Sequence, residues 1–141
     1  MYQTSLKDFI PGSKAPELKI RLECYLVYLK KYKEMHPHAH FEVITNTSHS
    51  VLSPSKELLI EAGILPKEDG TKNPKMPFEE YEPLFIQEMM KNEKAIERMK
   101  ELIEIAKIKD VFLVCFCKNP FECHRSLVAK IMKQLSKEGE S

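Results

Sequence analysis

The chain has 141 residues, of which 43% are hydrophobic and 30% are charged, the composition of a globular protein large enough for one core. Its formal net charge of +1 excludes a general attraction to nucleic acid or membranes, so such contact would need a local patch. No apolar run is long enough to span a membrane, and "MYQTSLKDFIPGSK" lacks the apolar core of a signal peptide. We therefore expect a single cytoplasmic domain over residues 1–141 that makes no membrane contact, with its four cysteines as thiols.

The first half of the chain is predicted to contain two strands and two helices. "MYQTSLKDF" is β-like, and the helical spacing of apolar residues over residues 17–35 predicts a helix that "HPHAH" ends. The β-branched "FEVITNT" predicts a strand over residues 41–45. In "SPSKELLIEAG" we expect Ser53 as the N-cap, Pro54 in the first turn and Gly63 at the C-terminal end of the second helix.

The second half begins with a surface loop rich in proline and lysine, "ILPKEDGTKNPKMP". Apolar stripes and Asn92 as an N-cap then predict further elements, namely helices over residues 79–90 and 92–106, a strand over 111–117, a helix over 123–135 and a disordered tail from 136 to 141. Alternation of this kind predicts an α/β domain. We expect a mostly parallel sheet with helices on both faces, in a Rossmann-like three-layer arrangement.

The strand "VFLVCFC" carries two of the four cysteines on one predicted face. Side chains alternate along a strand, so Cys115 and Cys117 share a face with Val111 and Leu113. Cys115 is expected in the interior as a small buried hydrophobic residue. Cys117 ends the strand at the carboxyl edge of the sheet, where α/β proteins bind their ligands.

"Cys-His-Arg" follows a tight turn and opens the final helix. The first turn of a helix offers unpaired N–H groups and a positive dipole end, which favour an anion or a thiolate. Arg125 adds a fork of donors suited to phosphate or carboxylate. We expect Arg125 to bind an anion, with Cys123 or Cys117 as a nucleophile and His124 as a proton carrier.

A zinc site is the rival interpretation, since the same segment offers three thiols and an imidazole, at Cys115, Cys117, Cys123 and His124. Cys-x-Cys within a strand does not chelate as a Cys-x-x-Cys knuckle does, and neighbouring side chains at a helix start are expected to point apart. We therefore favour no metal site and no cofactor. A Cys117–Cys123 redox pair lacks the Cys-x-x-Cys spacing. A purely structural role, with Arg125 in an ion pair, stays open.

"FLVCFCKNPFECHRSLVAKIM" resembles the signature of the domain of unknown function 488 (DUF488) family, in which a strand, a Cys and a short turn precede Cys-His-Arg. "MYQTS", "LSPSKELL" and "FEEYEPLFIQEM" are similar to further family segments, in the same order. The resemblance implies an α/β fold and a site that includes Cys115 or Cys117 with Cys123, His124 and Arg125. Because the family is uncharacterised, the resemblance implies no reaction.

The segment after the second strand departs from the family pattern. Many members carry an arginine there, whereas this chain reads "VITNTSHSVLSPS". Asn46, His49 and Ser50 could line the same crevice as Cys117 and Arg125, with His49 as an alternative proton carrier. Lys118 could join the lysines of the long loop in a basic rim, although such lysines usually serve solubility. "HPHAH" could bind a divalent metal on an extended strand, but we favour a solvated connector.

The leading functional hypothesis is a site for a small anionic ligand, such as a phosphate-bearing molecule or a nucleotide, with a Cys/His-dependent enzyme as its catalytic form. The alternative is a non-catalytic module that binds nucleic acid or a protein partner through the lysine loop. The sequence indicates neither the reaction nor the oligomeric state.

Overall fold

A three-stranded parallel sheet forms the centre of the protein in the computed structural model, which describes residues 17–45, 48, 50–115 and 123–140. The strands lie in the order β1-β3-β2, with β1 at Ile20–Arg21, β3 at Val111–Val114 and β2 at His40–Val43. Because all three run in one direction, their carboxyl ends meet at one edge. The predicted α/β class with a parallel sheet is confirmed.

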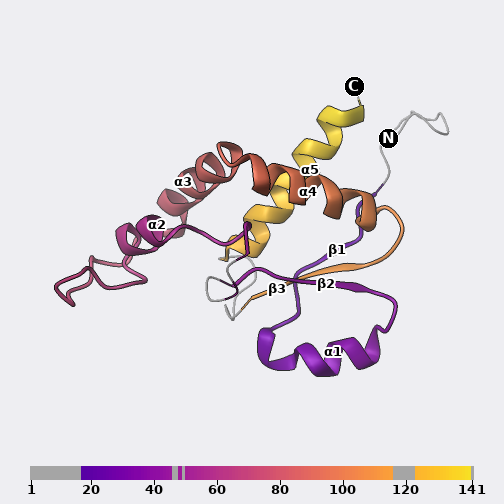
Figure 1. The fold of residues 1–141 in the computed structure, drawn as a ribbon, viewed down its shortest axis with the longest axis horizontal. Coiled ribbons are helices and arrows are strands. Elements are labelled where there is room, and N and C mark those ends of the chain that lie inside the picture. Colours follow the sequence, from indigo (N-terminus) through magenta and orange to yellow (C-terminus); the bar gives the residue numbers. More distant parts are fainter. Residues whose placement is uncertain (1–16, 46–47, 49, 116–122, 141) are drawn as a thin grey trace.

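Helices cover both faces of the sheet (Figure 1). The short helix η1 (Leu26–Tyr28) and α1 (Leu29–Met35) lie on one face, where Phe112 and Val114 pack with Cys24. On the other face, Val111, Leu113 and Cys115 share a larger core with the remaining helices: α2 (Lys56–Glu61), α3 (Phe78–Met90), α4 (Glu93–Ala106) and α5 (His124–Glu140). The alternation predicted for β3 and the three layers are therefore confirmed, while a Rossmann-like topology stays a prediction.

The segment predicted as the first helix is partly a strand. Leu18, Ile20 and Leu22 alternate and pack against the larger core, while Ile20 and Arg21 pair with β3, so helical structure starts only at Leu26. Sheet pairing, a non-local interaction, overrides the helical spacing of the same residues. The strand expected in "MYQTSLKDF" lies outside the described residues.

Two helix ends also differ from the expectation. The N-cap of α2 is Ser55, whose hydroxyl accepts a hydrogen bond from the Leu58 N–H, so Ser53 does not cap it and Pro54 precedes it. Helix α5 extends to Glu140, beyond the Leu135 expected as its end. Asn92 caps α4 as predicted, through bonds from the N–H groups of Lys94 and Ala95.

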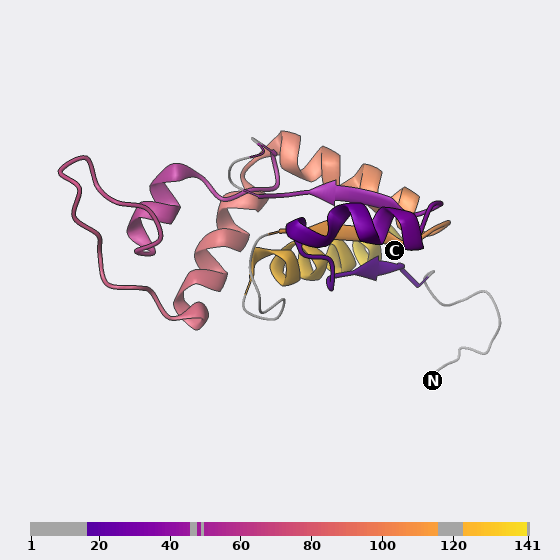
Figure 2. The ribbon, with the colours of Figure 1, turned by 90° about the horizontal axis from the view of Figure 1, so that it is seen from below.

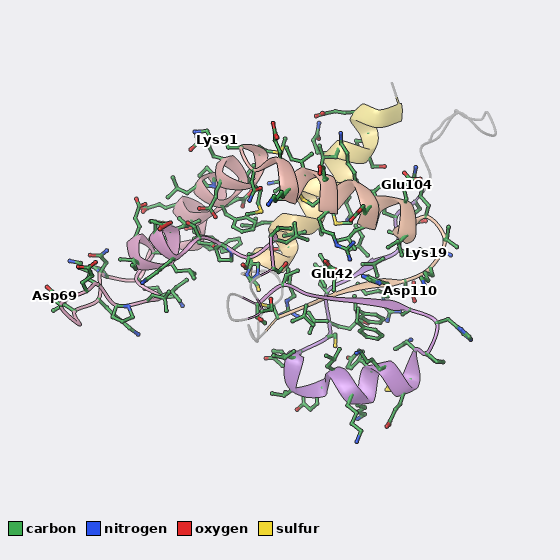
Figure 3. All side chains as sticks on the ribbon, in the orientation of Figure 1. Lys19, Glu42, Asp69, Lys91, Glu104 and Asp110 are labelled. Carbon is green, nitrogen blue, oxygen red and sulfur yellow. The ribbon has the colours of Figure 1, made fainter. Side chains whose placement is uncertain are left out.

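Glu42 on β2 connects the sheet to α4 on the face that this helix covers (Figure 3). Its carboxylate accepts hydrogen bonds from Arg98 at 2.8 and 2.7 Å and contacts His40 Nε2 at 2.8 Å. Burial alone would raise the pKa of Glu42, but the Arg98 and His40 contacts lower it below its ordinary value. The ion pair thus fixes α4 over β2.

The long loop lies at one end of the molecule, away from the sheet (Figure 2). Asp69 marks this distant end in Figure 3. The loop returns onto α2, because Met76 N–H donates to the Ala62 carbonyl and the Asn73 amide donates to that of Ile60. Within the described part of the chain, no helix combines the length and the apolar character that a membrane span requires.

We expect Gly63→Ala to lower the free energy of unfolding by about 2–3 kcal/mol. Gly63 has φ +79°, and a Cβ there would lie 2.6 Å from the backbone oxygens of Asn73 and Pro74. Gly70, with φ +87° and no atom within 4 Å of such a Cβ, is the matched control. Gly70→Ala should cost only about 1 kcal/mol in urea unfolding. Equal losses in the two variants would contradict a role for loop packing at Gly63.

Candidate Cys/His site

Two cysteine thiols meet where β3 ends and α5 begins. Cys115 follows β3, where it forms a bridge with Tyr25 and its carbonyl accepts from the Leu26 N–H at 3.1 Å. Cys123 immediately precedes α5, and its carbonyl accepts from the N–H and the hydroxyl of Ser126 at 3.0 and 2.8 Å. Both thiols are buried, and their sulfurs lie within 4.8 Å of each other. The backbone thus fixes both residues at the carboxyl edge of the sheet.

His124 lies against both sulfurs. Its Nδ1 is 3.8 Å from Cys115 Sγ and 3.8 Å from Cys123 Sγ. On the opposite side of the ring, Nε2 is 2.6 Å from the carbonyl oxygen of Ile44, directly after β2. The expectation that Cys123 and His124 point apart is therefore wrong, because the bond to Ile44 turns the imidazole under the sheet edge.

His124 is buried beside an aromatic ring and two thiols, and the thiols act on its pKa in the direction opposite to burial. Its side chain is buried, and the ring of Phe85 lies 5.7 Å from it, centroid to centroid. Burial by itself lowers the pKa of His124, but the hydrogen bonds and charges of Cys115 and Cys123 outweigh it and raise the pKa to about 10. The arrangement therefore favours a proton on the imidazole.

Arg125 extends toward the other neighbouring strand. Its Nη1 donates to the carbonyls of Leu22 and Cys24, at 2.7 and 3.1 Å, just after β1. Its guanidinium carbon lies 5.9 Å from the Tyr25 ring centroid, and only 1% of the residue is exposed. His124 and Arg125 thus join the start of α5 to the ends of β2 and β1. These bonds to backbone carbonyls give Arg125 a structural role. The sequence analysis considered such a role only through an ion pair.

The position of Cys115 beside the ring bears on the zinc interpretation. A sulfur that shares a metal ion with Nδ1 lies near the lone-pair axis of that nitrogen, roughly 1 Å or more farther from Nε2 than from Nδ1. Cys115 Sγ is instead 3.8 Å from Nδ1 and 3.9 Å from Nε2, so it lies off that axis, and Nε2 already contacts Ile44. Although the three donor atoms lie within 4.8 Å of one another, the geometry favours a thiol–imidazole contact over one shared metal ion.

The interpretation of Cys115 as a small hydrophobic residue captures only its burial. Cys24 illustrates that simpler role, since it is fully buried in the α1-side core and its thiol donates to the Tyr25 carbonyl at 3.5 Å. Burial, ahead of the opposing effect of Arg125, raises the pKa of the Cys24 thiol. Cys115 differs because its sulfur contacts an ionisable side chain.

Of the other predicted site residues, the structure describes Ser50, which lies on a surface groove. Ser50 accepts from the N–H groups of Leu52 and Ser53 and lines a surface groove between the start of α2 and the junction of α3 and α4. Lys91, which lines the same groove, marks that junction in Figure 3. Four further residues, Asn46, His49, Cys117 and Lys118, lie outside the described residues, and their roles stay predictions.

Two histidines of "HPHAH" make contacts that serve the fold. His40 pairs with Glu42, and the ring of His36 lies 5.0 Å from that of Phe112. Among the residues that the structure describes, the one group that could hold a metal by proximity is Cys115, Cys123 and His124. The interpretation of this segment as a solvated connector is therefore only partly right, because His40 belongs to β2 and His36 packs against Phe112.

These elements define the protein as an α/β domain with a buried Cys/His cluster at the carboxyl edge of a parallel sheet. The family model described as "Active DUF488-N3 subclade" matches residues 25–136, and the chain belongs to this DUF488 family. The matched region includes the whole cluster, and the predicted resemblance is confirmed. No curated protein and no solved structure gives a significant match to the chain.

Proposed function

We propose that this protein is an enzyme that uses the Cys123 thiolate as its nucleophile and His124 as its proton carrier. Its substrate is a small molecule whose reacting group carries or develops negative charge. The observation that carries this proposal is the position of His124, with Nδ1 3.8 Å from Cys123 Sγ and Nε2 held by the Ile44 carbonyl. The description of the family as an active subclade also supports an enzymatic role.

The hydrogen bond to Ile44 defines which nitrogen reacts. A carbonyl oxygen only accepts, so Nε2 carries a proton and the lone pair of neutral imidazole is on Nδ1, on the side of the sulfurs. Nδ1 can take the proton of the Cys123 thiol and later return it to a leaving group. The pKa of His124, raised to about 10, agrees with a thiolate–imidazolium pair.

The N-terminus of α5 supports an anionic reacting group. Cys123 immediately precedes this 17-residue helix, whose positive dipole end favours negative charge on sulfur and on a nearby leaving group. Since Arg125 donates to two backbone carbonyls, we assign the substrate's charge to the helix terminus and leave a structural role to Arg125.

Alkylation by iodoacetamide, followed by tryptic peptide mapping, tests this proposal. Trypsin separates Cys123 (residues 119–125) from Cys24 (residues 22–30), so each native protein carries its own control. We expect Cys123 to react at neutral pH at least about tenfold faster than Cys24, whose thiol is buried without a histidine contact. Millimolar phosphate should slow Cys123 and leave Cys24 unchanged.

Equally slow alkylation of both cysteines would contradict a thiol enzyme. If slow alkylation accompanied salt-sensitive binding to nucleic acid, the result would support the binding module instead. Stoichiometric zinc in protein purified without chelator, lost in Cys123→Ser, would support the metal interpretation and contradict the nucleophile.

A further inference from the structure

We propose that Cys115 is the second thiol of this site and that the substrate is a low-molecular-weight disulfide, which Cys123 and Cys115 reduce by forming a disulfide with each other. This inference rests on the proposed function, because it requires Cys123 as the nucleophile. It goes further by naming the substrate class and by assigning to Cys115 a chemical step.

The first argument is the meeting of two thiols from different elements. Cys115 follows β3 and Cys123 precedes α5, yet their sulfurs lie within 4.8 Å of each other. A disulfide needs an S–S distance of about 2.05 Å and a Cα separation of about 4.4–6.8 Å. The proposal therefore requires the two side chains to rotate until the neighbouring sulfurs meet.

The second argument is the shared histidine. Nδ1 of His124 lies 3.8 Å from each sulfur, so one imidazole contacts both thiols, and Cys115 reaches the Nδ1 lone pair once its side chain rotates. A cysteine that only fills space needs no such contact, as Cys24 shows with its backbone partner.

The third argument is burial. Cys115 is 4% exposed and Cys123 is 2% exposed, so a molecule that reaches these sulfurs must be small. A small disulfide also has the leaving group that this environment favours, since a thiolate is released beside a helix N-terminus and an imidazolium.

The reaction balances in two exchange steps. The Cys123 thiolate attacks one sulfur of R–S–S–R, which forms a mixed disulfide Cys123–S–S–R and releases R–S⁻. His124 passes the proton that it took from Cys123 to the released R–S⁻, which leaves Nδ1 free. The Cys115 side chain then rotates into line with Nδ1, gives it a proton and attacks the Cys123 sulfur, forming the Cys115–Cys123 disulfide and releasing the second R–S⁻. The small disulfide is reduced by two electrons, the two protein thiols are oxidised, and their two protons go to the released thiolates. A dithiol reductant restores the protein.

The test uses the full-length reduced protein with hydroxyethyl disulfide as the probe. We expect the wild type to yield the peptides of residues 110–118 and 119–125 joined by a disulfide. Cys115→Ser should instead stop at a mixed disulfide on Cys123 that lasts on the order of tenfold longer or more. Cys24→Ser is the matched control and should behave as the wild type.

Cys117 shares the 110–118 peptide with Cys115, so Cys117→Ser separates the two thiols. The joined peptides must persist in Cys117→Ser and disappear in Cys115→Ser; the reverse result would overturn the assignment of Cys115. Cys115→Ala replaces Cys115→Ser if circular dichroism shows that the serine variant is unfolded.

Failure of this inference and failure of the proposed function give different results. A wild type in which Cys123 is rapidly alkylated, but which leaves the disulfide unreduced or keeps a lasting mixed disulfide, overturns the inference alone. A wild type in which Cys123 reacts with neither iodoacetamide nor the disulfide overturns both.

Discussion

Arg125→Leu is expected to lower the free energy of unfolding by about 2–4 kcal/mol. The guanidinium is buried and donates to the carbonyls of Leu22 and Cys24, so leucine leaves two acceptors after β1 without these bonds. Arg125→Lys keeps the charge but cannot reproduce the planar fork, and we expect it to lose about half as much. Urea unfolding followed by circular dichroism measures both variants.

Lys130→Ala on the same helix is the control for a change of charge. Its ammonium group pairs with Glu82 but is largely exposed, and such pairs contribute about 0–1 kcal/mol. If Arg125→Leu were as stable as Lys130→Ala and also lost protection by phosphate, Arg125 would be the anion ligand predicted from sequence. Our assignment of a structural role would then be wrong.

His124→Gln is expected to slow alkylation of Cys123 at neutral pH by about 10–100-fold, the effect of losing a charged partner beside a thiolate. A glutamine amide can approximate Nε2 and still donate to the Ile44 carbonyl, but it offers no base in place of Nδ1. The remaining alkylation should rise steeply with pH, as for an ordinary thiol. In the wild type, His124 with a pKa raised to about 10 keeps its positive charge beside the sulfur between pH 7 and 9, so the difference between the two proteins should persist over this range.

The pH dependence of the free energy of unfolding gives a second measure of the contact between His124 and the two cysteines. The pKa of His124 is higher in the folded protein than its unfolded value of about 6.5. Protonation of His124 therefore contributes fully to the free energy of unfolding below about pH 6.5. The stabilisation should be lost as the pH rises through about 10, and His124→Gln should remove this dependence. His36→Gln, which changes a histidine in contact with Phe112, is the control and should leave alkylation of Cys123 unchanged. Equal alkylation rates in wild type and His124→Gln would exclude His124 as the proton carrier.

Local patterns predicted those parts of the fold that depend on local interactions. Asn92 caps α4, Gly63 takes its positive φ after α2, and β3 is apolar on both faces, as each residue pattern indicated. The sequence predicts a helix for the segment of Ile20 and Arg21, because the spacing of its apolar residues fits both a helix and a strand. Pairing with β3 is what makes this segment a strand.

The sequence by itself determined the α/β class and the family and indicated where the Cys/His cluster lies, because strand alternation and the position of Cys-His-Arg after a strand are properties of the chain. Only the tertiary structure decided how that motif is used. Any residue could supply the carbonyls of Ile44, Leu22 and Cys24, so no sequence signal indicated that His124 and Arg125 bind them. Those backbone bonds turn the imidazole toward Cys115 and Cys123 and hold the guanidinium against the end of β1, because buried polar groups must find partners wherever the packed chain provides them.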